Sequence, residues 1–267
     1  MSRGAPNWGD LTPRILSAVI LVALGGVALW LGNWAFVFLC VTCVGLMTWE
    51  LARMTRGEGR DYAIPLAFLA ALTLLSSLVV NTGLGVSILI LAPVLGLVTT
   101  RRDPLVWFAY AMVILAVGWS LIVMRIFLGI WPLLWLLAVV VASDVMGYFA
   151  GRLIGGPKFW PRISPKKTWS GTIAGWVGAA LVGVLFVATG RGGMAMILIS
   201  PFVALAGQMG DIAESAIKRR AGVKDSSNLI PGHGGMMDRF DALAFATLFV
   251  MAARLFLPIF ESAGAGG

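Results

Sequence analysis

Charged residues are scarce in this chain of 267 residues. They make up 12% of it, whereas 59% of the residues are hydrophobic and the mean hydropathy is +0.93. Soluble domains carry roughly 25% charged residues, so this scarcity argues against a water-soluble fold. Long apolar runs recur from Leu11 to Phe260, each near the ~20 residues that cross a hydrocarbon layer about 30 Å thick. The sequence therefore predicts an integral membrane protein whose main partner is the lipid bilayer.

Cysteine and histidine are also rare, with two cysteines and one histidine in the chain. Cys40 and Cys43 form a Cys-x-x-Cys pair inside an apolar run, without further cysteine or histidine partners nearby. This excludes a zinc site and a thioredoxin-like motif, and it favours structural packing of both side chains. A cleavable signal is also missing, because Met1–Asp10 is short and polar and no small-x-small site closes the first apolar run. That run is expected to be a retained span.

The apolar runs predict an all-α, polytopic transmembrane helical bundle of about nine spans with a cytoplasmic N-terminus. Residues 1–267 are expected to form a single integral membrane domain. Residues 1–130 would be mainly a transmembrane scaffold, and 131–267 the half that bears the active site. The predicted spans are 13–31, 33–51, 63–80, 84–98, 105–124, 130–150, 171–189, 194–213 and 240–260.

The positive charge is distributed asymmetrically over the connections between these spans. Of the 20 lysines and arginines, all but Arg125, Arg191 and Arg254 fall on the side assigned to the cytoplasm. This bias is typical of bacterial-type membrane topology and explains the net charge of +8 without nucleic-acid binding. It predicts an inner (cytoplasmic) membrane location, with Gly267 outside. The two longest polar connections, Gly151–Ser170 and Glu214–Arg239, would then face the cytoplasm and are where chemistry can be built.

Four polar residues share one face at the end of the eighth predicted span. Asp211, Glu214, Ser215 and Lys218 are spaced i, i+3, i+4 and i+7. A Glu214–Lys218 surface pair would explain part of the pattern. Asp211 sits where an apolar span meets water, and intramembrane carboxylates are costly enough to indicate function.

The segment that follows combines glycine, histidine and carboxylates. Gly232, Gly234 and Gly235 permit the close backbone approaches that phosphate cradles require. Asp238 and Asp241 open the ninth predicted helix with both carboxylates on one side. Asp238 could simply stabilise a helix N-terminus, but the hard oxygen ligands and nearby cations favour a Mg²⁺–polyphosphate site.

A second candidate region surrounds the end of the sixth predicted span. Asp144 lies there and is expected to face the protein interior or a wet cavity. The connection after it is rigid, cationic and rich in hydroxyls, and leads into a helix, which is compatible with anion binding. Its candidate ligand-binding residues are Ser164, Lys166, Lys167 and Thr168. Gly171, Gly175 and Gly178 then line the seventh span at helical spacing, which indicates close helix packing.

The chain resembles the phosphatidate cytidylyltransferase family, also called CDP-diglyceride synthases. The resemblance rests on Ser215–Arg219, Lys224–Asp225 and Pro231–Asp241, with upstream support from Ser143–Arg152 and Pro161–Gly171. Ser170 stands where a glutamate is expected after Trp169. The resemblance covers the second half of the chain well and the first half only through its spans.

This resemblance implies that the phosphate of phosphatidic acid attacks the α-phosphorus of CTP and releases pyrophosphate, with CTP and phosphatidic acid as substrates. It also implies Mg²⁺, with K⁺ near it. Asp211 and Asp238 are the first candidates as metal ligands, followed by Asp241 and Asp144. Lys166 and Lys167 are expected to reach the nucleotide. The remaining candidate site residues are Lys218, Arg219, Lys224, Asp225, His233 and Arg239 as catalytic residues, with Ser215, Gly234 and Gly235 as binding residues.

Two other functions fit parts of the sequence. A CTP-dependent polyprenol or lipid kinase would share the membrane architecture but would need to deprotonate a hydroxyl. An ion or lipid transporter could use Asp144 and Asp211, but it has no evident use for the His-Gly-Gly loop and for cations on one side. The oligomeric state stays open, with a homodimer as one option.

Overall fold

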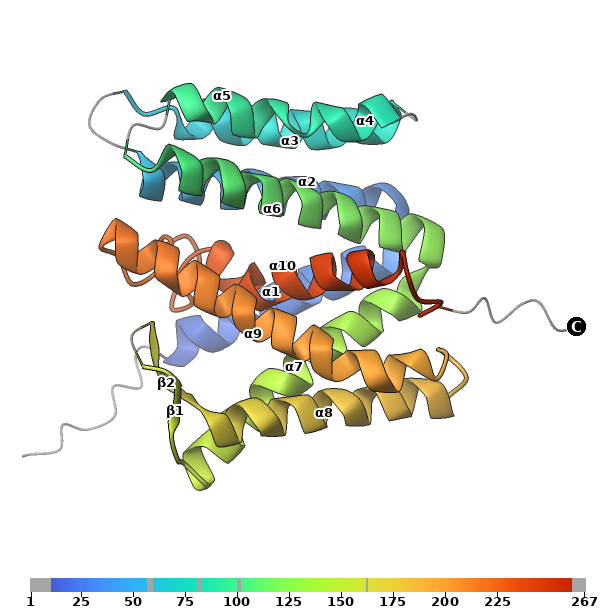
Figure 1. The fold of residues 1–267 in the computed structure, drawn as a ribbon. Coiled ribbons are helices and arrows are strands. Elements are labelled where there is room, and N and C mark those ends of the chain that lie inside the picture. The colour runs from blue at the N-terminus through green and yellow to red at the C-terminus, as the bar shows by residue number, and fades with distance from the viewer. Residues whose placement is uncertain (1–10, 57–59, 81–82, 100–101, 162, 261–267) are drawn as a thin grey trace, which may run out of the picture.

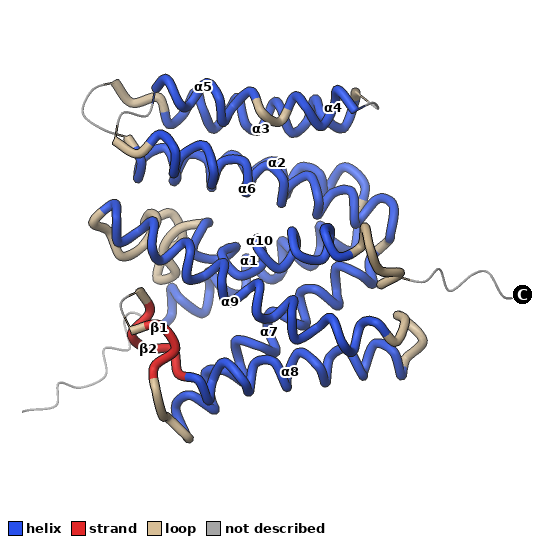
Figure 2. Tube along the Cα trace, in the orientation of Figure 1, coloured by secondary structure: helices blue, strands red, loops and turns tan. Residues whose placement is uncertain are grey.

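The computed structural model describes residues 11–56, 60–80, 83–99, 102–161 and 163–260. Within them the chain is a bundle of helices with one small antiparallel hairpin, β1–β2, between α7 and α8 (Figures 1 and 2). This confirms the predicted all-α class. The elements are α1 Leu11–Leu31, α2 Asn33–Thr55, α3 Ala63–Val79, α4 Gly83–Ile88, α5 Leu91–Thr99, α6 Pro104–Val123, the π-helix η2 Met124–Leu128, α7 Ile130–Leu153, β1 Lys158–Trp160, β2 Ser164–Thr168, α8 Trp169–Ala188, α9 Ala195–Ala221 and α10 Met237–Ala253.

The helices follow the predicted spans, and the fourth span is divided between two short helices. Residues 84–98 are divided between α4 and α5, because a turn at residues 89 and 90 separates the two helices. Pro93 lies in the first turn of α5, where its missing N–H and fixed φ are tolerated but a helix continuing from before it would be disrupted. Six helices are long and apolar enough to cross a membrane, namely α1, α2, α6 with η2, α7, α8 and α9. The count of nine spans stays a prediction, because α3, the α4–α5 segment and α10 are shorter.

The four polar connections gather at one end of the bundle (Figure 1). The end of α2, the start of α6, the β1–β2 hairpin and the α9–α10 loop all lie on the left of the view. Arg125, Arg191 and Arg254 belong to segments at the opposite end, in η2, after α8 and after α10. The fold therefore separates the cationic segments in the way that the charge pattern indicates.

Helix packing brings α7, α8, α9 and α10 into contact in sequence, and α10 also touches α6. The glycines of α8 permit its close approach to α7, as predicted. A Cβ at Gly175 would lie 2.7 Å from Ser143 Oγ, and one at Gly171 would lie 2.6 Å from the Gly147 carbonyl oxygen. Cys40 and Cys43 are buried in the core as free thiols, which confirms their predicted packing role.

Candidate active site

The site lies at the polar end of the bundle, where α7, the hairpin, α8, α9 and α10 surround a cavity of about 610 Å³. Pockets of this size hold ligands as large as a nucleotide or a drug. The cavity lining contains both carboxylates and cations. Its polar lining consists of Ser143, Asp144, Tyr148, Arg152, Lys166, Lys167, Thr168, Thr172, Gln208, Asp211, Asp238 and Asp241.

Two close contacts between α9 and α10 bring carboxylates from both helices together. A Cβ at Gly210 would collide with the Asp241 carbonyl oxygen, and one at Gly207 would lie 3.2 Å from that of Ala242. This close approach of the backbones lets the carboxylates of Asp211 on α9 and Asp241 on α10 lie within 4.8 Å of each other. Sequence reasoning missed these two glycines, although their three-residue spacing is a recognisable packing signal.

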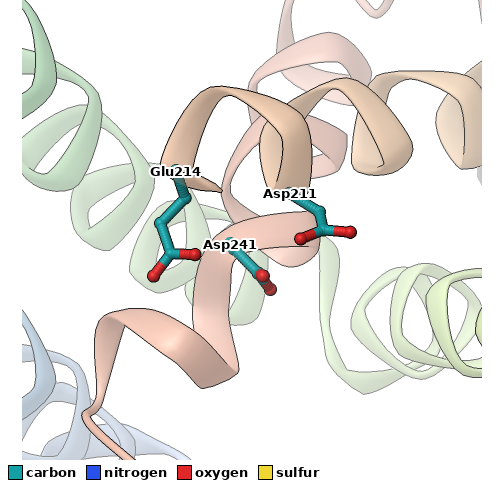
Figure 3. A group of neighbouring side chains, drawn as sticks. All are labelled: Asp211, Glu214 and Asp241. Atoms are coloured by element: carbon teal, nitrogen blue, oxygen red, sulfur yellow. The ribbon is translucent and has the colours of Figure 1, made fainter. Parts of the chain in front are cut away.

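Asp211, Glu214 and Asp241 form the acidic cluster, shown in Figure 3. One oxygen of each lies within 4.8 Å of the others. Glu214 is fully buried, and no hydrogen-bond donor among the described residues reaches its Oε1 atom. An ionised carboxylate offers only acceptors, so an orphaned oxygen beside two further carboxylates suits a cation. The chemistry of these groups therefore fits a hard metal ion such as Mg²⁺.

Two lysines pair with this acidic surface. Lys167, at the end of the hairpin, forms an ion pair with Asp211. The Lys218 ammonium lies 2.5 Å from Glu214 Oε2 and 2.5 Å from Asp238 Oδ1. The i,i+4 pair of Glu214 and Lys218 therefore forms, but it is buried and is not the surface pair considered from the sequence. Lys218 does not itself line the cavity, so in this arrangement it connects the two carboxylates.

Asp238 lines the cavity but already has several protein donors. Its Oδ2 atom accepts hydrogen bonds from the Gly235 amide at 2.8 Å, from the Ser226 amide at 2.9 Å and from the Ser226 hydroxyl at 2.8 Å. Burial acts to raise the pKa of Asp238, but the Lys218 and Gly235 hydrogen bonds, together with those from Ser226, outweigh it and hold the pKa below its ordinary value. Asp238 therefore fixes the loop before α10 and faces the cavity from there.

The cationic connection is shaped by its own hydroxyls. Thr168 is the N-cap of α8, because its Oγ1 accepts the Gly171 amide hydrogen bond at 3.2 Å. Ser170, where a glutamate was expected, donates to the Gly155 carbonyl oxygen at 2.5 Å. Lys166 and Lys167 consequently line the cavity, whereas Ser164 pairs with Trp160 in the hairpin and does not.

His233 has a different neighbourhood from the one expected. Its Nδ1 atom lies 2.7 Å from the hydroxyl of Ser17 on α1, and that hydroxyl lies 3.0 Å from the Pro231 carbonyl oxygen. Arg239 donates to the His233 carbonyl oxygen at 3.0 Å. The histidine thus contacts α1, and it does not line the cavity.

The predicted site residues divide between the cavity and its surroundings. Those that line it are Asp144, Lys166, Lys167, Thr168, Asp211, Asp238 and Asp241. Those outside its lining are Ser164, Ser215, Lys218, Arg219, Lys224, Asp225, His233, Gly234, Gly235 and Arg239. Sequence reasoning did not single out Arg152, Gln208, Tyr148 or Glu50, a buried carboxylate of α2 that contacts the α9–α10 loop.

Comparisons with known proteins identify the family of the chain. The model of the cytidylyltransferase family matches residues 12–257. A phosphatidate cytidylyltransferase of Brucella suis biovar 1 (strain 1330) is 33% identical over 267 residues, covering 95% of this chain and 97% of the relative. The proteins of that name from Helicobacter pylori (strain ATCC 700392 / 26695) and Bacillus subtilis (strain 168) are 44% identical over 136 residues and 41% identical over 115 residues, covering 50% and 42% of this chain and 50% and 43% of those proteins.

The chain is a membrane-embedded nucleotidyltransferase. It belongs to the cytidylyltransferase family.

Proposed function

We propose that this protein transfers the cytidylyl group of CTP to phosphatidic acid. An oxygen of the lipid phosphate bonds to the α-phosphorus of CTP, the bond from that phosphorus to the bridging oxygen breaks, and pyrophosphate leaves. The observation that carries the proposal is the cavity of about 610 Å³ at the polar end of a membrane bundle, with carboxylates and cations in one lining. The names of the relatives support the choice of substrates.

The residues of the cavity suit two polyanionic substrates. Lys166 and Arg152 line it, and the described residues include no acidic partner within ion-pair distance of either one. Arg152 Nη1 donates to the Tyr148 hydroxyl at 2.7 Å, and its remaining N–H groups, like the Lys166 ammonium, can contact phosphate oxygens. Two large apolar side chains follow Arg152 and are exposed, Leu153 at the end of α7 and Ile154 directly after it, so acyl chains can lie beside a charged head group held at Arg152.

The attacking group needs little activation. A phosphate monoester has a second pKa near ~6 and is largely ionised at neutral pH. The protein's task is then to position two anions and to stabilise an in-line transition state. This removes the need for a general base, and it agrees with the place of His233 outside the cavity lining.

The acidic cluster is the proposed metal site. Asp211 and Asp241 would hold Mg²⁺ with Glu214 behind them, while Asp238 and Asp144 face the same cavity. A bound Mg²⁺ would neutralise charge on the triphosphate. Lys167 and Lys218 limit repulsion among the carboxylates through their ion pairs. The accompanying K⁺ is part of this proposal and rests on the family resemblance alone.

A single assay tests the proposed reaction. Purified protein in detergent is incubated with labelled CTP and phosphatidic acid, with and without Mg²⁺, and the labelled lipid is identified by mass. CDP-diacylglycerol formed only with Mg²⁺ is expected. Phosphorylation of a polyprenol in a parallel reaction would favour the kinase alternative, and nucleotide-independent flux in liposomes would favour a transporter.

The proposed orientation places the cavity at the cytoplasmic face of a bacterial inner membrane. Cysteines are introduced separately at Asn228 in the α9–α10 loop and at Thr189 after α8, both exposed positions at opposite ends of the bundle. The native Cys40 and Cys43 are buried, which keeps the background low. In intact cells an impermeant thiol reagent should label position 189 and spare 228. The reverse pattern would invert the topology.

A further inference from the structure

A buried carboxylate on α2 supports the active site from outside it. Glu50 is fully buried and does not line the cavity. Its Oε1 accepts hydrogen bonds from the Met236 amide at 2.8 Å and the Ser227 hydroxyl at 2.6 Å. Its Oε2 accepts from the Met237 amide at 2.7 Å and lies 3.2 Å from the Ser226 hydroxyl. No lysine or arginine among the described residues forms an ion pair with it.

These contacts make Glu50 the N-terminal cap of a helix to which it does not belong. Met236 precedes α10 and has no side-chain acceptor, so the first amides of α10 depend on a group from elsewhere. The carboxylate also interacts favourably with the positive end of the α10 dipole. Because α2 is far from α10 in sequence, this bond ties the two parts of the chain together.

The connection continues into the cavity. The Ser226 hydroxyl, beside Glu50, donates to Asp238 at 2.8 Å, and Asp238 pairs with Lys218, which pairs with Glu214 of the acidic cluster. Gly235 in the same loop cannot be replaced by a residue with a side chain without a collision, because a Cβ there would meet Glu50 and the Ser226 hydroxyl. The anchor, defined as Glu50 with Ser226, Ser227 and the amides of Met236 and Met237, therefore fixes where α10 begins.

We infer that Glu50 is a positioning residue for cytidylyl transfer. It sets the start of α10, and through it the places of Asp238 and Asp241 in the cavity, without touching the substrates. This inference rests on the proposed function for its activity readout. Its structural readout, the exchange of the loop amides, is independent of the reaction.

The sharpest test is Glu50→Gln, which keeps the shape. Each carboxylate oxygen accepts one backbone amide, so in either orientation the glutamine NH₂ group faces a backbone N–H and a bond is lost. Thr48→Val is the matched control, because Thr48 is buried on the same helix and its hydroxyl has no hydrogen-bond partner among the described residues.

We expect kcat of Glu50→Gln to fall about 10- to 100-fold, as for other supporting residues around a site, with a smaller change in KM for CTP. Hydrogen exchange of the amides from Ser226 to Asp238 should quicken by about tenfold or more, while the amides of α8 stay as in wild type. Thr48→Val should match wild type in both. Wild-type loop exchange in Glu50→Gln, or equally faster exchange throughout the bundle, would overturn the inference.

Two further outcomes of the experiment are also decided, a variant that does not fold and a wild-type protein without activity. If Glu50→Gln yields too little folded protein, Ser227→Ala removes one donor and leaves the carboxylate, and it should give the same localised exchange at smaller amplitude. Wild-type exchange in that variant contradicts the inference. If wild-type protein forms no CDP-diacylglycerol, the proposed function fails, and the exchange data still decide the role of Glu50.

Discussion

Two groups of carboxylates lie close together in this protein and are surrounded in opposite ways. In the acidic cluster, Asp211, Glu214 and Asp241 crowd within 4.8 Å, and one Glu214 oxygen lacks any donor among the described residues. In the anchor, Glu50 accepts from three donors, the amides of Met236 and Met237 and the Ser227 hydroxyl. The neighbouring Asp238 accepts from four, the Lys218 ammonium, the amides of Gly235 and Ser226 and the Ser226 hydroxyl.

This difference distinguishes carboxylates that can bind a cation from carboxylates that hold the protein in place. A carboxylate saturated by protein donors is already stabilised and holds a fixed geometry. In the acidic cluster the ion pairs of Asp211 with Lys167 and of Glu214 with Lys218 offset only part of the mutual repulsion, so an added cation stabilises these carboxylates further. The amides that Glu50 holds and Asp241 of the acidic cluster belong to the same stretch, Met236 to Asp241, at the start of α10. The anchor can therefore position a residue of the cluster.

The largest effect is expected from Asp211→Asn and Asp241→Asn. Either change removes a charge from the acidic cluster, so cytidylyl transfer should fall by about 10³-fold or more. Without metal, the melting temperature of Asp241→Asn should be unchanged or higher, because one like charge is lost, whereas Asp211→Asn also loses the ion pair with Lys167. Mg²⁺ should raise the melting temperature of wild type and have less effect on the variants. Normal turnover and an unchanged Mg²⁺ response in both would remove the metal-site assignment.

Asp238→Asn should behave differently, because both oxygens of the Asp238 carboxylate already accept hydrogen bonds from the protein. The asparagine NH₂ must face either Lys218 or the donors from Ser226 and Gly235, so a favourable contact is replaced by an unfavourable one. We expect a large loss of activity together with a loss of stability of about 1–3 kcal/mol. Turnover and thermal unfolding measured on the same samples check this. A variant that is inactive but as stable as wild type would place Asp238 with the acidic cluster.

The fold was largely predictable from the sequence, because long apolar runs and charge asymmetry report directly on a membrane bundle. The division between α4 and α5 was not predicted, since both pieces read as one apolar run with an internal Pro93. The number of spans could not be fixed from hydropathy alone, because α3 and α10 have 17 residues each, which is near the lower limit for crossing a bilayer.

The candidate site was predictable where its residues are neighbours in sequence. Asp211, Glu214 and Lys218 share a helical face by spacing, and Asp238 with Asp241 does too. Long-range contacts were out of reach, because nothing in the local pattern joins Glu50 to Met236 or Ser17 to His233. Arg152 was also out of reach, because in the sequence its charge is explained by the positive-inside bias, and only the structure shows that it lines the cavity.

A smaller effect is expected from His233→Ala. The imidazole bonds to Ser17 and helps to hold the loop against α1, so kcat/KM should fall about tenfold, below the 10²–10⁴-fold typical of a general acid or base. Ser17→Ala, which removes the other partner, should cost a similar factor. Profiles of kcat/KM against pH decide the matter. Near-total inactivity of His233→Ala with loss of the acidic limb would make His233 an essential base.

The smallest effect at the loop is expected from Asp225→Asn. Asp225 belongs to the family-like stretch as firmly as Asp238 does, but its side chain is exposed and does not line the cavity. An exposed carboxylate is served by water, so the change should alter kcat/KM by no more than about threefold, the range of ordinary surface substitutions. Asp61→Asn is the matched control, because Asp61 is an exposed aspartate in the connection between α2 and α3, in a surface ion pair with Arg56. Parallel steady-state assays of both variants against wild type give the answer. A loss at Asp225 comparable with that of Asp211→Asn, with Asp61→Asn unaffected, would mean that this stretch of the loop moves into the cavity when substrates bind, and the boundary between binding and support would have to be redrawn to include it.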